Sequence, residues 1–266
     1  MFEKLTNENY YSKESNFLYM SCSQFKDFLK CEREALEKIE GIIEEEKTPA
    51  LLFGGYVDAY FSNELEKYKE QNPSMFLKSG ELKADYRNVN EVINAFEEDE
   101  LLYQAISGEH QVIMTGFIAG VPFKIKIDSY HEGECIVDQK VMRDFNLIWN
   151  DEKHKKMDFV EMYGYDLQGA IYQEIVRQNT GLKLPFVLAI ATKEECPDKL
   201  LMEIDQKYLD SALDLVKELA PHFQAIKYGD EVPCGCGKCP SCRRIKKLTK
   251  VVRYGEFFRK EDEECQ

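Results

Sequence analysis

Two stretches of alternating apolar and polar residues place the tightest constraint on what this chain can fold into. Residues 110–130 read HQVIMTGFIAGVPFKIKIDSY, an alternation typical of strands that bury one face. Within this stretch, Ala119-Gly120 predicts a hairpin turn. The turn HEGE follows, and ECIVDQKV at residues 134–141 predicts another strand. We therefore expect a three-stranded meander near the middle of the chain.

Helical patterns lie on both sides of this meander. We expect helices at residues 21–46, 49–68 and 85–106 before it, and after it a helix at 158–181, strands at 184–192 and 199–205, and a helix at 206–229. Ser21 or Ser23 suits the N-cap of the first helix, and Gly181 suits a C-cap. An interruption is expected near Glu98-Asp99. This order predicts a mixed α/β fold with helices packed on a central sheet.

The composition is that of one soluble globular domain. The chain has 266 residues, of which 44% are hydrophobic and 32% charged, enough to build a single large core. We expect a helical part at 18–108, the core at 109–230, a cysteine-rich basic segment at 231–250 and a frayed tail at 258–266. The net charge of -14 argues against binding nucleic acid over the whole surface, but not against a local basic groove.

Targeting and membrane-spanning patterns are not found in the sequence. Residues 1–25 contain no basic segment followed by an apolar run, so we expect no signal peptide. No window approaches 18 consecutive apolar residues, so we expect no contact with a membrane. The expected location is the cytoplasm.

Acidic residues and a lysine interrupt the predicted strands. Asp138 and Lys140 are two positions apart and therefore share a face of one strand, while Asp128 ends the adjoining strand. Neighbouring carboxylates repel unless a cation lies between them, and a divalent metal with oxygen ligands meets that need. A lysine beside the metal can orient a water or stabilise charge on a phosphate. This pattern fits a Mg²⁺-dependent phosphodiester hydrolase; the alternative is a turn residue near an ordinary surface ion pair.

Four features in order resemble the PD-(D/E)XK nucleases over roughly residues 18–250. The closest resemblance is to the exonuclease VIII type of phage and prophage recombination exonucleases and the related RecB-type nuclease domains. The features are SCSQFKDFLKCEREAL with Cys31, LLFGGYVDAYF with Gly54 and Asp58, Asp128 with Asp138-Gln139-Lys140, and LQGAIY with Gln168 and Tyr172. Asp58 departs from the family, since RecB-type relatives have a metal-binding histidine there. An aspartate can still bind a hard cation, and a merely solvated Asp58 is the alternative.

The resemblance implies a restriction-endonuclease-like core and a set of roles for these residues. Asp58, Asp128, Asp138 and the main-chain carbonyl of Gln139 would bind Mg²⁺ or Mn²⁺ for two-metal hydrolysis of DNA. Lys140 would orient the attacking water, and Gln168 and Tyr172, which share a helical face, would look onto the active site and the DNA backbone.

The same resemblance also implies a substrate and partners. The expected activity is an exonuclease that processes double-stranded DNA ends in phage-type recombination, with a single-strand annealing protein as partner and ring-like homo-oligomers. Two alternatives remain open. One is a catalytically degenerate nuclease fold that acts as a DNA-binding or assembly module, and the other is a redox or metal protein built on the cysteines alone.

Nine cysteines are many for an intracellular chain, and their odd number and clustering favour metal ligation over disulfides. One assignment is a local Zn²⁺ site made by Cys234, Cys236, Cys239 and Cys242. The other is similar to the iron–sulfur nucleases among the RecB-type and CRISPR-adaptation enzymes, and joins Cys31 to Cys236, Cys239 and Cys242 around a [4Fe–4S] cluster. Reduced cysteines without a metal are the third alternative.

A basic stretch, RRIKKLTKVVR, follows the cysteine cluster and carries six cations in eleven residues. Arg243, Arg244, Lys246 and Lys247 at its start are candidates for contact with DNA phosphates. The alternative is a solvated helix end.

Overall fold

A five-stranded sheet forms the centre of the computed structural model, which describes residues 4–43 and 47–258. Its strands, in spatial order, are β1 (Glu109–Ile118), β2 (Val121–His131), β3 (Cys135–Met142), β6 (Phe186–Thr192) and β7 (Lys199–Glu203). Strands β3 and β6 run parallel, and the other neighbours are antiparallel. Ala119 and Gly120 turn the first hairpin with positive φ angles of 49° and 80°. The predicted meander is therefore confirmed within a mixed sheet.

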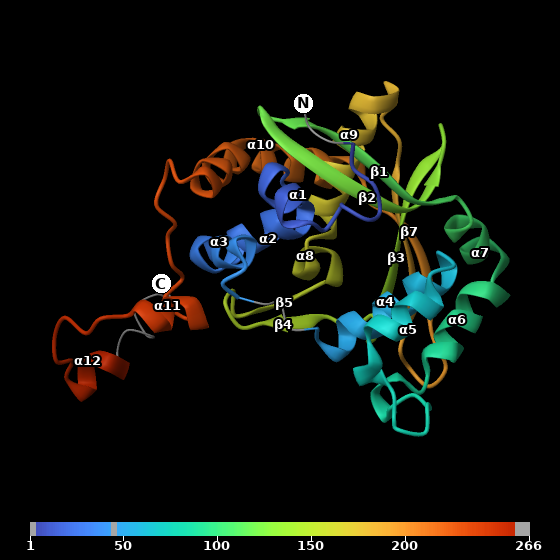
Figure 1. Cartoon of the computed structure of the whole chain (residues 1–266), viewed down its shortest axis with the longest axis horizontal. Coiled ribbons are helices and arrows are strands. Elements are labelled where there is room, and N and C mark those ends of the chain that lie inside the picture. The colour runs from blue at the N-terminus through green and yellow to red at the C-terminus, as the bar shows by residue number, and fades with distance from the viewer. Residues whose placement is uncertain (1–3, 44–46, 259–266) are drawn as a thin grey trace.

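Helices cover both faces of this sheet (Figure 1). One face packs against α2 (Cys22–Lys30), α9 (Tyr165–Thr180) and α10 (Gln206–Tyr228), and the other against α4 (Pro49–Phe61), α6 (Val89–Glu98) and α7 (Glu100–Ile106). Successive strand residues alternate between the two cores: Ile136 of β3 lies in the first and Val137 in the second. The prediction of a mixed α/β fold with helices flanking a central sheet is thus confirmed.

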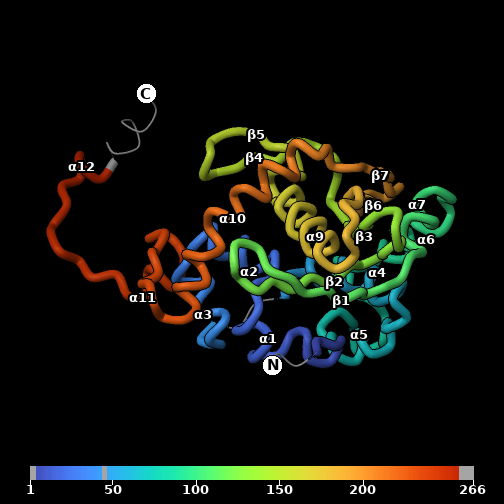
Figure 2. Tube along the Cα trace, turned by 90° about the horizontal axis from the view of Figure 1, so that it is seen from above, coloured from blue at the N-terminus to red at the C-terminus, as the bar shows by residue number. Residues whose placement is uncertain are grey.

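Shorter elements complete the chain. They are α1 (Lys13–Leu18), α3 (Glu32–Glu40), α5 (Leu65–Gln71), 3₁₀ turns at Pro73–Met75 and Ala84–Tyr86, a ribbon of β4 (Ile148–Asn150) and β5 (Lys155–Met157), α8 (Phe159–Tyr163), α11 (Pro240–Ile245) and α12 (Tyr254–Phe258). Figure 2 shows the segment that carries α12 running away from the rest of the molecule. Beyond residue 258, the predicted tail lies outside the described residues. Within the described part of the chain, no helix combines the length and apolar character needed to cross a bilayer.

Three predicted helices are broken into two. The expected helix at 21–46 divides into α2 and α3 at Cys31, whose φ of -164° and ψ of 109° are those of an extended residue, and residues 44–46 lie outside the described chain. The helix expected at 158–181 divides into α8 and α9 at Gly164, which has a left-handed φ of 62°. The helix expected at 49–68 ends at Phe61, and α5 begins at Leu65.

Other boundaries are confirmed. Ser21 caps α2 by accepting the N–H of Gln24, and Gly181 ends α9 with a φ of 80°. The interruption expected near Glu98-Asp99 separates α6 from α7 at Asp99. Side-chain capping and glycine mark these helix ends, and both are local signals that can be read from the sequence.

Candidate active site

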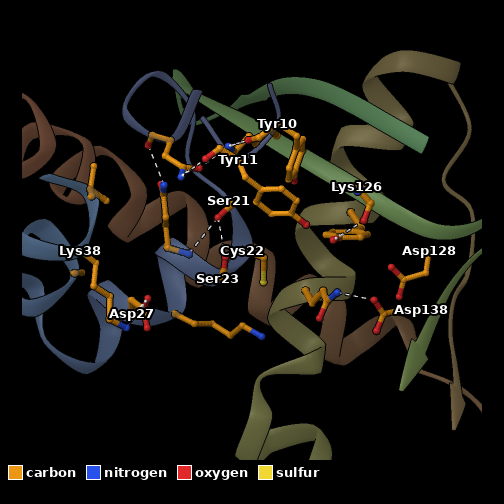
Figure 3. Close-up of a pocket in the computed structure, with 18 of the residues that line it drawn as sticks. Tyr10, Tyr11, Ser21, Cys22, Ser23, Asp27, Lys38, Lys126, Asp128 and Asp138 are labelled. Carbon is orange, nitrogen blue, oxygen red and sulfur yellow. Dashed lines mark hydrogen bonds and ion pairs between the residues drawn. The ribbon is translucent and has the colours of Figure 1, made fainter. Parts of the chain in front are cut away.

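The pairing of strands β2 and β3 ends where the predicted acids lie. Strands β2 and β3 pair through three residue pairs, from His131 with Cys135 to Ser129 with Val137. Beyond these pairs, a side-chain hydrogen bond replaces the backbone pairing of the two strands. Oδ2 of Asp128 accepts a hydrogen bond of 3.0 Å from the backbone N–H of Gln139. Asp128 and Asp138 therefore lie side by side at the opening between two strands (Figure 3).

Asp138 is a buried carboxylate with two fixed partners. Only 2% of the residue is exposed, and its Oδ2 lies 2.5 Å from Nζ of Lys140. Gln168 of α9 donates from Nε2 to the other oxygen, Oδ1, at 2.6 Å. A buried carboxylate is tolerated when its charge is paired and its oxygens are hydrogen-bonded. The site therefore holds the charge of Asp138 in one orientation.

Lys140 is kept protonated by its acidic neighbours. Burial alone lowers the pKa of this lysine, but the negative charges of Asp138 and Asp128 outweigh burial and leave the pKa above its ordinary value. Its Nζ also lies 3.4 Å from the carbonyl oxygen of Gln139 and 5.6 Å from the centre of the Tyr165 ring. The structure thus places a fixed ammonium group beside the two acids.

Asp58 approaches the same point from α4. Its Oδ1 accepts a hydrogen bond of 3.0 Å from Nε2 of Gln111, a residue of β1. Gln111 has a φ of 59°, which is uncommon outside glycine and often marks a functional position. The pair of Gln111 with Asp128 is missing from the ladder, although the pairs on either side of it form. The backbone of β1 is therefore bent at the point that faces the acids.

One pocket of about 410 Å³ contains these groups. The predicted residues that line it are Asp58, Asp128, Asp138, Lys140, Gln168 and Tyr172. Tyr172 is 9% exposed and donates from its hydroxyl to the carbonyl oxygen of Lys126 at 3.0 Å, so it also supports the strand that carries Asp128. Residues distant in sequence thus converge on one cavity.

The charge of this pocket differs from that of the chain. Among the described residues, five lysines and four aspartates line it, whereas the whole chain carries -14. An anionic substrate is therefore less strongly repelled here than over the molecule as a whole. The negative net charge of the whole chain therefore does not argue against nucleic-acid binding in this pocket.

Two of the three acids, Asp128 and Asp58, resist ionisation. Burial raises the pKa of Asp128 well above its ordinary value, and the negative charge of Asp138 raises it further. Burial also raises the pKa of Asp58, while Lys126 and Lys140 partly offset that rise. A divalent cation among the carboxylates would reverse both shifts, and carboxylate oxygens are the ligands that Mg²⁺ and Mn²⁺ prefer. The side chains present therefore fit such an ion.

Sequence reasoning missed many residues of this pocket, among them Tyr10, Tyr11, Gln111 and Lys126. Gln111 could have been found by counting back from the Ala119-Gly120 turn, since this register sets it opposite Asp128. Tyr10 and Tyr11 precede every recognised motif, and no sequence signal connects them to the acids.

A second cluster lies at the break between α2 and α3. The sulfur atoms of Cys31, Cys236, Cys239 and Cys242 all lie within 4.8 Å of one another. Sγ of Cys31 lies 3.6 Å from the sulfurs of both Cys239 and Cys242. Cys234 is exposed and lies outside this group. The structure therefore gathers one early and three late cysteines, and the local set that includes Cys234 does not form.

The pKa shifts of these cysteine thiols favour binding of a cation. The N–H groups of Cys239 and Lys238 donate to Sγ of Cys236 and lower its pKa to about 6, which favours the thiolate that binds metals. Burial raises the pKa of Cys239 to about 12 and also raises that of Cys31. Without a cation the group therefore resists further ionisation, and a bound metal would favour the thiolate form of all four.

The predicted basic residues lie beside this cysteine cluster. Arg243 and Arg244 belong to α11, and Lys246 and Lys247 follow it. None of the four lines the acid pocket. Arg244 forms an ion pair of 2.8 Å with Glu37 of α3, so at least this cation has a structural partner. A role for the four in binding DNA stays a prediction.

Comparison with known proteins identifies the family of the chain. Residues 21–245 match the family described as a PDDEXK-like domain of unknown function, DUF3799. The crystal structure of a "Putative exonuclease" from Eubacterium rectale is 44% identical, covers 97% of this chain and 99% of that chain, and superposes with a TM-score of 0.90. A solved structure of SSO0001 is 13% identical, covers 82% of this chain and 96% of that chain, and has a TM-score of 0.29, too low to bear on the argument.

No curated protein matches the chain. The family match nevertheless spans most of the sequence and includes the pocket residues from Asp58 to Tyr172 as well as the four clustered cysteines. The resemblance to PD-(D/E)XK nucleases is thereby confirmed, and the chain belongs to the DUF3799 family of PDDEXK-like domains.

Proposed function

We propose that this protein is a Mg²⁺- or Mn²⁺-dependent deoxyribonuclease that degrades double-stranded DNA from its ends. The observation that carries the proposal is the convergence of Asp58, Asp128, Asp138 and Lys140 on one pocket. The 44% identical structure named as an exonuclease supports the same class of reaction.

The metal would be held by oxygen ligands from three elements. Asp58 of α4, Asp128 of β2 and Asp138 of β3 would supply carboxylates, with the main-chain carbonyl of Gln139 as a further ligand. When bound, one or two such ions supply a Lewis acid for the phosphoryl oxygens and a water of lowered pKa. The Asp–Lys pair of β3 would then lie at the edge of the reacting phosphate.

The residues around the acids would position and stabilise the reacting groups. Lys140 is held in its protonated form, so it acts through its charge and its N–H donors rather than as a base. Gln168 fixes one oxygen of Asp138 and thereby the direction in which the carboxylate faces the pocket. Gln111 does the same for Asp58. Fixed dipoles of this kind stabilise developing charge without reorganising during the reaction.

The biological setting of the proposal comes from the family resemblance. We place this exonuclease in phage-type recombination, with a single-strand annealing protein as partner and a ring-like homo-oligomer as the assembly. The arginines and lysines around α11 would contact DNA phosphates outside the pocket.

The four clustered cysteines would hold a structural metal. A Zn²⁺ ion bound tetrahedrally at about 2.3 Å sets its sulfurs roughly 3.8 Å apart. The sulfur pairs Cys31–Cys242 and Cys236–Cys242 lie 3.6 Å and 4.0 Å apart, which is close to that spacing. The [4Fe–4S] cluster that the resemblance implies uses the same four ligands but needs them further apart. Either group would join α3 to the C-terminal segment.

Cleavage of linear and covalently closed circular duplex DNA tests the proposed activity. We expect the purified protein to shorten linear DNA in Mg²⁺ or Mn²⁺, to leave the closed circle intact, and to lose activity in EDTA. Equal cleavage of circle and linear DNA would refute the requirement for an end. No cleavage of either DNA in either metal would refute the nuclease.

A further inference from the structure

The N-terminal segment from Tyr10 to Tyr19 forms part of the acid pocket although it precedes the residues that the family match covers, 21–245. Tyr10, Tyr11 and Asn16 all line the pocket. Figure 3 shows the two labelled tyrosines close to Lys126, in the same cavity as Asp128 and Asp138. The pocket therefore includes residues that lie outside the stretch matched by the family model.

Two buried lysines hold this segment in place. Lys124 of β2 is 1% exposed and donates to the carbonyl oxygen of Tyr10, to Oγ of Ser15 at 2.9 Å and to Oδ1 of Asn16 at 2.7 Å. Lys227 of α10 is 3% exposed and donates to the carbonyl oxygens of Asn16 at 3.0 Å and Tyr19 at 2.9 Å.

Moving the segment would take from Lys124 the three acceptors named above and would leave Lys227 with only Oε1 of Gln24, at 3.2 Å. Such a loss is costly, because a buried amino group needs hydrogen-bond partners whether it is charged or neutral. The backbone beneath Tyr10 and Tyr11 is therefore a fixed part of the site rather than a loosely packed arm.

Tyr11 presents an open aromatic surface on this fixed support. In the part of the chain that the structure describes, three tyrosines line the pocket. Tyr10 and Tyr172 are 6% and 9% exposed, whereas Tyr11 is 70% exposed. The Tyr10 ring meets the Tyr11 ring edge-on, with 4.9 Å between centroids and an interplanar angle of 81°. Nζ of Lys126 lies 5.4 Å from the centre of the Tyr11 ring. An exposed, oriented ring thus stands beside a cation and the acids.

We infer that the Tyr11 ring stacks on a nucleobase at the DNA end, next to the bond that the acids cleave, and that Lys126 contacts a neighbouring phosphate. This inference rests on the proposed nuclease function and identifies how the substrate end is held. Stacking tolerates any base, since every base has a π face, and it contributes about 1–3 kcal/mol per base. Phosphate contacts position the strand without reading its sequence. Tyr11 and Lys126 together suit sequence-independent binding of an end.

Substitution of Tyr11 tests the inference through DNA binding in EDTA, where no cleavage interferes. The probe is a duplex with 2-aminopurine near its end, which reports stacking by fluorescence and affinity by anisotropy. We expect Tyr11→Ala to weaken binding roughly 5- to 150-fold, as the loss of one stacked base implies, and to abolish the stacking signal. Tyr11→Phe keeps the ring and should retain both.

Tyr208→Ala is the matched control. Tyr208 of α10 is 53% exposed and has Nζ of Lys207 at 4.6 Å from its ring centre, but it does not line the acid pocket. This variant should bind and quench as the native protein does.

The inference is overturned if Tyr11→Ala binds and quenches normally, or if Tyr11→Phe is as weak as Tyr11→Ala while both variants unfold at the native temperature. A failure of the nuclease proposal can be distinguished from this result, because the native protein would then cleave DNA in neither Mg²⁺ nor Mn²⁺. Native cleavage combined with a normal Tyr11→Ala variant rejects stacking alone.

Discussion

Asp138→Asn is expected to lower the rate of DNA cleavage about 1000-fold or more, the scale on which loss of a single preorganised electrostatic group lowers kcat. The substitution keeps the shape of the side chain and removes its charge. It takes away a carboxylate ligand and leaves Lys140, 2.5 Å away, without its counter-ion. Because that partner is largely buried, we also expect a loss of roughly 3 kcal/mol in unfolding free energy. Single-turnover cleavage and thermal unfolding measure the two effects.

DNA binding by this variant separates catalysis from folding and from a purely DNA-binding role. We expect Asp138→Asn to bind duplex ends, since Tyr11, Lys126 and the other lysines of the pocket remain. Asp210→Asn is the control, because Asp210 forms an exposed pair with Lys183 at 2.9 Å and lies outside the pocket. A variant at Asp138 that cleaves DNA at the native rate would show that the acid pocket is not the active site.

Cys31→Ser should remove the metal that we propose for the cysteine cluster and lower the melting temperature by roughly 10 °C. This value follows from the 2–5 kcal/mol typical of a lost covalent cross-link and from the response of a domain of this size. Cys31 is 5% exposed and has the extended backbone conformation that separates α2 from α3. Its sulfur connects this break to Cys242, 211 positions later in the chain. Elemental analysis for zinc, iron and sulfide, with calorimetry, measures both effects.

Cys234→Ser is the matched control for this prediction. Cys234 is exposed, lies two residues before Cys236, and is outside the group of four sulfurs. It should keep the metal and the native melting temperature. Metal retained by Cys31→Ser, or lost from Cys234→Ser, would contradict the assignment of the four ligands. A native protein that contains neither zinc nor iron when prepared without oxygen would also contradict it.

The fold follows from the sequence wherever local signals act alone. The period of two in residues 110–130 and the Ala119-Gly120 turn predict the hairpin, because alternation and a positive-φ turn specify register. The breaks at Cys31 and Gly164 could not be predicted in this way. The apolar helical spacing continues across each of them, and Cys31 leaves the helix at the point where its sulfur meets three cysteines more than 200 residues away.

The site residues likewise fall into those that local sequence patterns predict and those that depend on the fold. Asp138 and Lys140 follow from strand parity, and Asp128 follows from the meander that sets it beside them. Asp58 was reached only through the family resemblance, since nothing in its own helix marks it. Gln111 follows from the register of the hairpin. Tyr11 and Lys126 gain their roles from tertiary contacts, so one sequence without its fold gives no reason to connect them with the acids.

Anomalous diffraction from crystals soaked in Mn²⁺ tests most directly whether Asp58, Asp128 and Asp138 form a divalent-cation site. The expected result is a manganese peak in the acid pocket, within coordination distance of carboxylate oxygens from all three residues and absent from Asp138→Asn crystals. A native protein that cleaves DNA in Mn²⁺ while its crystals bind manganese only outside this pocket would contradict the account.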